Sequence, residues 1–279
     1  MILIADCGST KIDWCVVKNG KVVKQIFTCG MNAVMLTEEE MTERIANELM
    51  PELGDDEITE VYFYGAGCIN EEVCGHVAGA IRKNLPAAKV IEVHTDLLGA
   101  SRALCGRNAG IACILGTGSN SCYYDGTQIC ENVSPLGYIL GDEGSGAVLG
   151  KIFLGDVLKN QLPKHICDKF LKEYELDRNT IIRRVYREPQ GNRFLASVTP
   201  FLIQNIKEPE IHDLVLNAFK AFFKRNVTQY AAYKELKVNF IGSIAYYYRE
   251  VLLEAAKEFD CTVGTIIKSP MEGLIQFHS

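Results

Sequence analysis

The chain has 279 residues, of which 48% are hydrophobic and 23% charged, and its formal net charge is −6. This length and composition predict a globular protein with one large domain or two smaller ones. The acidic balance argues against a surface for nucleic acid or for an anionic membrane, so neither is expected as a partner.

Eleven cysteines are scattered singly along the chain, with no Cys-x-x-Cys pair and no Cys/His cluster at zinc spacing. Their odd number indicates free thiols in a reducing compartment rather than a disulfide framework. The N-terminus lacks the charged and apolar regions of a signal peptide, and no apolar run approaches the roughly 18 residues of a membrane span. We therefore expect a cytoplasmic protein.

Two segments with the same order of elements stand about one domain apart. The first segment has predicted strands at 2–5, 12–17 and 22–27. The second has predicted strands at 111–115, 121–124 and 128–131. Asn19-Gly20 and Asp125-Gly126 are the hairpin turns in matching places. The repeated pattern predicts an internal duplication.

Helices and strands alternate between the two segments. Thr37 with Glu40 forms a capping-box pattern that begins a helix, and Pro51 is expected to end it. The next predicted elements are a strand at 60–64, a helix at 70–85, a strand at 90–93 and a helix from about 96.

The second half of the chain is expected to be mostly helical from 144 to 233, before a strand at 237–241, a helix to 259 and a strand at 262–267. The pattern predicts a mixed α/β fold with a helical insertion. We expect domains of 1–107 and 108–268, with the tail 269–279 a candidate to pack back on the first domain.

Small residues follow the first strand of each duplicated segment. Asp6 ends the first strand, and Gly8, Ser9, Thr10 and Lys11 follow it. In the second segment, the strand at 111–115 is followed by Gly116, Thr117, Gly118 and Ser119. Turns of this kind expose backbone N–H groups that bind phosphate, and Asp6 is placed to hold Mg²⁺ through water. An Asx-type turn at Asp6 is the alternative.

Asp96 follows a predicted strand and begins a helix, so it has two possible roles. Most aspartates at such a corner cap the helix. A carboxylate there can also face a cleft and act as the base that phosphoryl transfer requires.

Glycines surround Asp142 and Glu143 in the stretch 141–146. Two adjacent carboxylates can bind sugar hydroxyls or metal, or cap the helix that follows. Gly242-Ser243 closes a strand and begins a helix, which suits packing beside an adenosine, with a serine cap as the alternative. The tyrosines 246–248 are expected to be packing residues.

Five motifs in this order resemble those of the BadF/BadG/BcrA/BcrD-type ATPase family, and within it the N-acetylglucosamine kinase branch. They lie at 6–11, 95–100, 116–120, 137–146 and 242–243, and the similarity extends over essentially the whole chain. The branch belongs to the sugar kinase, heat-shock protein and actin superfamily. The resemblance implies two ribonuclease-H-like domains flanking an ATP cleft.

The resemblance also implies roles and a homodimer. Asp96 would be the base that takes the proton from the attacking sugar hydroxyl. The turns at 8–11 and 116–119 would bind the phosphates of ATP, and Asp6 would lie near Mg²⁺. Asn32, Asn120 and Asp142 would hold the amino sugar, with Glu143 beside them, and Gly242 would lie against the adenosine.

Some residues depart from the family pattern, and they leave the sugar open between N-acetylglucosamine, N-acetylmuramic acid and glucosamine. Cys7 replaces a glycine of the first turn, and Ala33 follows Asn32 where an aromatic residue is usual. Two other functions remain alternatives: an iron–sulfur activator ATPase of an acyl-CoA dehydratase or reductase, and a non-catalytic sugar or nucleotide sensor.

Overall fold

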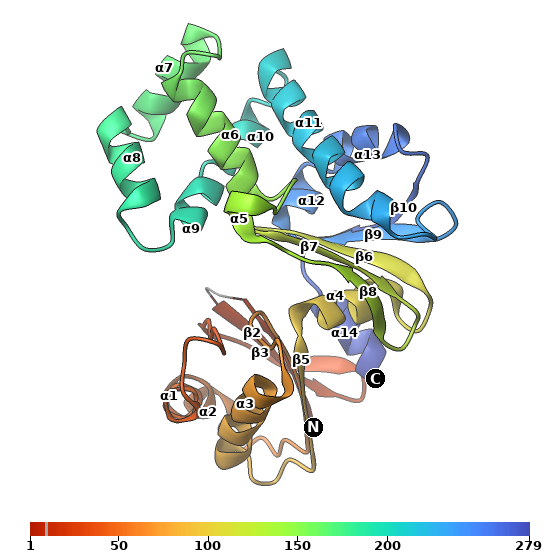
Figure 1. Ribbon diagram of the computed structural model, residues 1–279. Coiled ribbons are helices and arrows are strands. Elements are labelled where there is room, and N and C mark those ends of the chain that lie inside the picture. The colour runs from red at the N-terminus through yellow and green to blue at the C-terminus, as the bar shows by residue number, and fades with distance from the viewer. Residues whose placement is uncertain (9–10) are drawn as a thin grey trace. The chain divides into compact units, whose positions relative to one another are not determined.

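The computed structural model describes residues 1–8 and 11–279, which form two compact units (Figure 1). Unit 1 contains Met1–Asn108, Asp125–Ile129 and Ser269–Ser279, and unit 2 contains Ala109–Tyr124 and Cys130–Lys268. A five-stranded mixed sheet forms the centre of each unit.

The sheet of unit 1 has the strand order β3-β2-β1-β4-β5. Its strands are β1 (Ile2–Cys7), β2 (Lys11–Lys18), β3 (Lys21–Cys29), β4 (Glu60–Gly65) and β5 (Val90–Thr95). Strand β1 runs antiparallel to β2 and parallel to β4, and β4 runs parallel to β5. Apolar residues fill both faces of β1 because helices cover the sheet on both sides.

Side chains of alternate residues along β1 enter two different cores, as the period of a strand requires. Ala5 packs with Trp14 and with residues of α1 (Glu38–Arg44) and α3 (Glu71–Asn84). Ile4 packs with Tyr64 and with residues of α14 (Met271–His278). Helix α4 (Asp96–Cys105) packs against α14 on this second face.

The sheet of unit 2 has the order β10-β9-β6-β7-β8. Its strands are β6 (Gly110–Leu115), β7 (Ser119–Tyr124), β8 (Ile129–Val133), β9 (Lys237–Ile241) and β10 (Thr262–Ile267). Taken in chain order, these strands occupy the same sheet positions as β1 to β5, and the antiparallel and parallel pairs correspond. The predicted duplication is therefore confirmed.

The helical insertion of unit 2 is divided into several helices around one large aromatic core. Phe153, Phe170 and Phe201 pack against one another within it, with ring centroids 4.9 to 5.5 Å apart. Its helices are α5 (Gly137–Leu140), α6 (Gly146–Leu158), α7 (Lys164–Glu173), α8 (Arg178–Tyr186), α9 (Gly191–Ala196), α10 (Thr199–Gln204), α11 (Pro209–Arg225) and η2 (Val227–Gln229). Two further helices, α12 (Ser243–Tyr247) and α13 (Arg249–Lys257), connect β9 to β10.

The first predicted helix begins as expected but ends later. Thr37 and Glu40 form the reciprocal hydrogen bonds of a capping box. The expectation that Pro51 ends the helix is wrong, because a π-helical turn (Ile45–Leu49) leads into α2 (Met50–Leu53) with Pro51 in its first turn. Proline is tolerated there, since its missing N–H would have no partner in a first turn.

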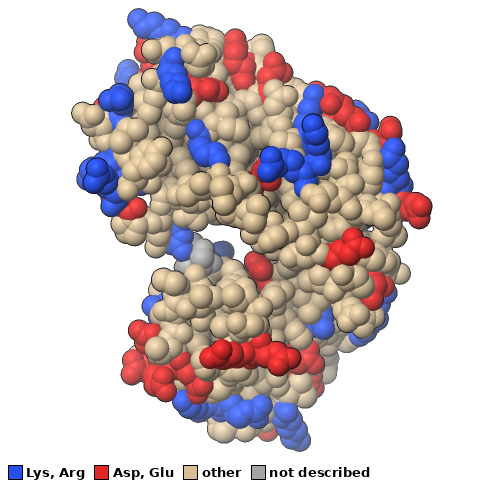
Figure 2. All heavy atoms as spheres, in the orientation of Figure 1, with Lys and Arg blue, Asp and Glu red and all other residues tan. Residues whose placement is uncertain are grey.

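The eleven cysteines all lie within the described residues and are free thiols. In the part of the chain that the structure describes, no helix is long and apolar enough to cross a bilayer. On the face shown in Figure 2, acidic and basic side chains form several small groups of both signs.

Candidate functional site

Three parallel strands of unit 1 end at the same edge of the sheet. Cys7 of β1 pairs with Gly65 of β4, and Gly65 pairs with Thr95 of β5. Asp6 and Asp96, which lie far apart in the sequence, are therefore brought to one edge. The carboxyl ends of parallel strands are the usual place for ligands in such sheets.

The turn after β1 is closed by a hydrogen bond from the Gly8 N–H to the carbonyl oxygen of Lys11, with an N···O distance of 3.0 Å. The Lys11 ammonium lies 4.8 Å from the centroid of the Phe27 ring. Ser9 and Thr10, two of the predicted phosphate donors, lie outside the described residues.

Thr95, and not Asp96, caps helix α4. The Thr95 hydroxyl accepts a hydrogen bond from the Leu98 N–H at 3.1 Å. Asp96 is the first residue inside the helix, where its carboxylate accepts from the Leu97 N–H at 2.9 Å. The interpretation of Asp96 as the cap is therefore wrong. Burial raises the pKa of Asp96, so its carboxylate takes up a proton more readily than an exposed aspartate does.

Asp6 lies directly opposite Asp13 in the register of β1 and β2. Burial, followed by the charges of Asp96 and Asp13, raises the pKa of Asp6 to about 7, and the charge of Lys11 opposes this rise. Gln25 donates to both carboxylate oxygens of Asp13, at 2.9 and 3.1 Å. Sequence reasoning missed Asp13, although its place across a hairpin turn from Asp6 could have indicated it.

This concentration of carboxylates fits a divalent cation. The charges of Asp13 and Asp96 both act on Asp6, with Lys11 as the opposing positive charge. Within residues 1–8 and 11–279, no three His, Cys, Asp or Glu side chains are arranged as direct metal ligands. Magnesium commonly keeps several waters and binds few protein groups. Contact between Asp6 and Mg²⁺ through water is therefore the mode that fits.

Asn32 lies in a loop beside the same sheet edge. Its side-chain oxygen accepts a hydrogen bond from the Val34 N–H at 3.2 Å. A Cβ atom on Gly67, in the loop after β4, would lie 2.8 Å from that oxygen. The Cys7 thiol at the end of β1 donates to the Met31 carbonyl at 3.1 Å. The loop of Asn32 is thus held close to the ends of β1 and β4.

In unit 2, the turn between β6 and β7 is held by helix α6. Gly116 donates to the Gly118 carbonyl at 3.0 Å, which closes the turn. The N–H groups of Gly146 and Ala147 donate to the carbonyls of Gly116 and Thr117 at 2.8 and 3.0 Å. The first N–H groups of α6 are thus hydrogen-bonded to the turn, and the position of the turn is determined by the helix.

Gly242 approaches the same turn so closely that no side chain fits. Its φ is 118°, and a Cβ atom would lie 2.3 Å from the Leu115 carbonyl oxygen. Gly242 is also the N-cap residue of α12, so the interpretation of Ser243 as a cap is wrong.

Ser243 lines a mostly apolar cavity of about 370 Å³. Tyr247 lines it too, is 52% exposed, and accepts a hydrogen bond from the Lys268 ammonium at 2.7 Å. Tyr248 is buried as predicted, and its hydroxyl donates to the Thr199 carbonyl. The prediction of packing roles for the tyrosines is therefore wrong for Tyr246 and Tyr247, which are both exposed. A cavity of this size suits a flat aromatic ligand.

Asp142 lies at the edge of a second cavity in unit 2, of about 420 Å³. Its backbone is left-handed, with φ of 54°. Burial raises the pKa of Asp142, while hydrogen bonds from the N–H groups of Ser119 and Gly137 lower it in part. A Cβ atom on Gly118 would lie 2.9 Å from the Asp142 carboxylate. The glycine turn and the carboxylate are therefore in direct contact.

Glu143 lines the same cavity but is already paired. Its carboxylate lies 2.6 Å from the Arg225 guanidinium and accepts from Asn226 at 3.4 Å. Asn120 is not among the residues of this cavity, and it lies on the face of β7 opposite to Ser119 because strand residues alternate. Its oxygen accepts from Asn132 at 2.9 Å. The structure thus brings together Asp142, Glu143 and Ser119 at this cavity, whereas the Asn120 side chain is bonded to Asn132.

Two copies of one sheet topology, each with a short turn after its first strand, define the two-domain actin-like ATPase fold of sugar kinases. A solved structure of a "putative N-acetylglucosamine kinase" from Porphyromonas gingivalis is 50% identical to this chain, with a TM-score of 0.97. The alignment covers 100% of this chain and 98% of that chain. The protein belongs to the same family as this Porphyromonas kinase.

Two more distant structures share the fold. A "putative N-acetylglucosamine kinase" from Chromobacterium violaceum is 16% identical, with a TM-score of 0.78 over 100% of this chain and 98% of that chain. A ROK family glucokinase from Streptomyces griseus, in complex with glucose and AMPPNP, is 12% identical, with a TM-score of 0.57. That alignment covers 99% of this chain and 97% of that chain. No protein-family model and no curated protein matches the chain.

Proposed function

We propose that this protein is an ATP-dependent, Mg²⁺-requiring kinase of an amino sugar, with N-acetylglucosamine as substrate and its 6-hydroxyl as acceptor. The proposal is supported by the name of the Porphyromonas relative and by the resemblance of the motifs to the N-acetylglucosamine kinase branch of the BadF/BadG/BcrA/BcrD-type ATPases. We also propose a cytoplasmic homodimer, as that resemblance implies.

The observation that carries the proposal is that Thr95, and not Asp96, caps helix α4. Because Thr95 caps α4, the Asp96 carboxylate is not required to begin the helix. Its charge raises the pKa of Asp6 at the end of the neighbouring strand β1, so the two groups lie within electrostatic reach. In the proposal Asp96 takes the proton from the sugar hydroxyl, and a carboxylate with a raised pKa is a better base.

The two glycine-containing turns would bind the phosphates. Backbone N–H groups in such turns offer hydrogen bonds to phosphate oxygens. The first turn includes Gly8, Ser9, Thr10 and Lys11, and the second includes Gly116, Thr117, Gly118 and Ser119. The N–H groups of Gly8, Gly116 and Ser119 are already hydrogen-bonded within the protein, so other donors of the two turns would contact the phosphates. Bound Mg²⁺ would neutralise charge on the transferred phosphoryl group. Asp6 would orient that ion through a water molecule.

The remaining residues would select the two substrates. Asn32, Asn120 and Asp142 would hold the sugar hydroxyls and the acetamido group, as the resemblance implies. Glu143 forms an ion pair with Arg225, and through this pair it would affect the charge at Asp142 and in the cavity. Gly242 and Ser243 would lie beside the adenosine, and the exposed ring of Tyr247 would line the pocket for the base.

The test is turnover of ATP with Mg²⁺ against N-acetylglucosamine, N-acetylmuramic acid, glucosamine, N-acetylmannosamine and glucose. We expect stoichiometric ADP with N-acetylglucosamine and little with the other sugars. Asp96→Asn is expected to lower kcat by about 10²-fold or more while the KM for the sugar changes little, because a general base has been removed.

Asp55→Asn, at an exposed loop position of unit 1, is the matched control and should keep full turnover. Slow ATP hydrolysis that is indifferent to every sugar, in a brown protein that contains iron, would instead support the activator ATPase. Sugar binding without any turnover would support the sensor.

A further inference from the structure

Unit 1 contains a cavity of about 360 Å³ that none of the candidate site residues lines. It is lined by residues of α4, α14, β4, β5 and the segment Asp125–Ile129, and by Arg107 after α4. Its volume lies within the range of small-molecule sites. The lining includes Glu92, Arg102, Arg107, Thr127, Phe277 and His278.

Two guanidinium groups share one aromatic ring at this cavity. Arg102 lies 5.0 Å and Arg107 4.8 Å from the centroid of the Phe277 ring. Cation–π contacts of this kind hold each guanidinium group against the ring. The cavity therefore has two positive charges at its wall.

The lining has one acidic side chain against these two arginines. Glu92 is the acidic side chain among the lining residues, and its carboxylate lies 3.1 Å from the His94 ring and 3.8 Å from Arg102. Within residues 1–8 and 11–279, Arg107 forms no ion pair. The Arg102 Nε atom is buried and has no hydrogen-bond partner in the described chain. A buried donor without a partner is costly, so a ligand that accepts this hydrogen bond would be favoured.

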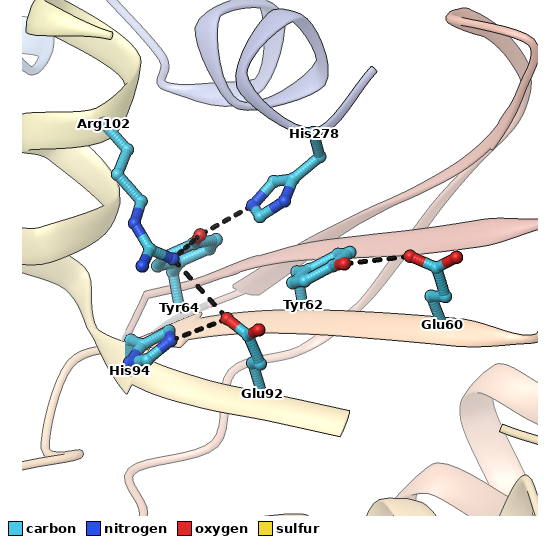
Figure 3. Close-up of polar contacts among 7 residues, drawn as sticks. All are labelled: Glu60, Tyr62, Tyr64, Glu92, His94, Arg102 and His278. Atoms are coloured by element: carbon cyan, nitrogen blue, oxygen red, sulfur yellow. Dashed lines mark hydrogen bonds and ion pairs between the residues drawn. The ribbon is translucent and has the colours of Figure 1, made fainter. Parts of the chain in front are cut away.

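Arg102 and His278 both approach the Tyr64 hydroxyl (Figure 3). Arg102 donates to the Tyr64 hydroxyl at 2.7 Å, and that hydroxyl lies 2.7 Å from His278 Nε2. Tyr62 stacks on the His278 ring with centroids 3.7 Å apart. Burial lowers the pKa of His278 to about 4, and Arg102 is the second cause. The His278 ring is thus neutral at pH 7. The positive charges that lower its pKa would also attract an anion into the cavity.

We propose that this cavity binds a small anion that carries a phosphoryl group, held by Arg102, Arg107 and the hydroxyl of Thr127. Guanidinium groups match the oxygens of a phosphoryl group with two parallel hydrogen bonds, and the two arginines outnumber the one acidic side chain of the lining. Inorganic phosphate and a phosphate monoester share this chemistry. Arg102 lies on α4, so the anion contacts the helix that begins at Asp96.

The experiment is calorimetric titration of the full-length protein with inorganic phosphate, in the presence of saturating AMPPNP so that the glycine turns are occupied. We expect one saturable site per chain and at least tenfold weaker binding by Arg107→Gln. Arg107 is exposed, so this variant is expected to fold. Arg82→Gln, at an exposed position on α3, is the matched control and should bind as the wild type does.

A second readout is the His278 ring in NMR titrations, because a bound anion must raise its pKa. We expect this rise in the wild type and not in Arg107→Gln. Replacing phosphate with N-acetylglucosamine 6-phosphate or glucose 6-phosphate in the same titration distinguishes the sources, since tighter binding of a monoester identifies an organic phosphate. Absence of saturable phosphate or monoester binding, or equal binding by Arg107→Gln, would overturn the proposal.

Discussion

The Thr95 hydroxyl caps helix α4, and the Asp96 carboxylate next to it accepts a hydrogen bond from the adjacent Leu97 N–H. The two residues stand at the corner where β5 ends and α4 begins. A carboxylate at such a corner is normally explained by capping. Here the cap is a different residue, so the half-buried carboxylate of Asp96 requires another explanation, and a catalytic role supplies one.

Thr95→Ala and Asp96→Asn should therefore affect stability differently. Loss of the cap is expected to lower the free energy of unfolding by about 1 kcal/mol. Asp96→Asn is expected to leave it unchanged or to raise it at pH 7, because burial penalises the charged form of Asp96. Urea denaturation of both variants at pH 7 checks this. A loss in Asp96→Asn as large as that in Thr95→Ala would show that Asp96 is structural.

Asp6 should make the Mg²⁺-free protein less stable as the pH rises. Its pKa is raised from 3.8 to about 7, so the folded protein binds this proton more tightly than the unfolded chain does. The free energy of unfolding therefore falls between pH 4 and pH 7. Asp6→Asn removes this contribution and should be more stable than the wild type at pH 8, but not at pH 4.

Urea denaturation at the two pH values, in EDTA, measures the effect for Asp6. Asp55→Asn in the exposed loop before β4 should behave as the wild type at both values. Equal stability of Asp6→Asn and the wild type at pH 8 would contradict the raised pKa.

Gly99 should determine how closely α4 approaches the sheet. A Cβ atom on Gly99 would lie 2.8 Å from the ring of Tyr64, which is buried on β4. Gly99→Ala must therefore displace α4 or the ring, and we expect a loss of about 1 to 3 kcal/mol of stability together with lower kcat. Thermal unfolding and ATP turnover measure the two effects.

Gly75→Ala on α3 is the matched control for Gly99. No atom lies within 4 Å of the position that a Cβ atom on Gly75 would occupy, and α3 gains an alanine in its interior. We expect this variant to be more stable by about 0.5 to 1 kcal/mol with unchanged turnover. A Gly99→Ala variant as stable and active as Gly75→Ala would show that α4 has room to shift.

His278 should make the protein sensitive to acid. Its pKa is lowered from 6.5 to about 4, so the unfolded chain binds this proton more tightly. The free energy of unfolding therefore falls as the pH is lowered from 6.5 to 4. Allowing for solvent screening of this partly exposed ring, we expect a contribution of about 1 to 2 kcal/mol.

His278→Asn should reduce this acid dependence, whereas His76→Asn at an exposed position of α3 should keep it. Urea denaturation at pH 4.5 and pH 7 compares the variants. An unchanged pH dependence in His278→Asn would mean that other groups cause the loss of stability in acid.

Local patterns predicted the parts of the fold that depend on neighbouring residues. Apolar runs with turn residues between them identified the strands, and the repeated order of these runs identified the duplication. The Thr37–Glu40 capping box was correct because its hydrogen bonds join residues three apart. The predicted end of that helix was wrong because proline breaks a helix only in its interior, and Pro51 lies in the first turn of α2. The π-helical turn before α2 has no clear sequence signal.

The sequence by itself determined that Asp6 and Asp96 lie at strand ends and that glycine turns follow two of the strands. Those features depend on strand ends and turn residues, which are local. Only the tertiary structure decided that Asp13 faces Asp6, that Asn120 is bonded to Asn132, and that Arg102 meets His278 through Tyr64. These relationships depend on strand register and on the packing of distant segments, where each contact is determined by the whole core rather than by nearby residues.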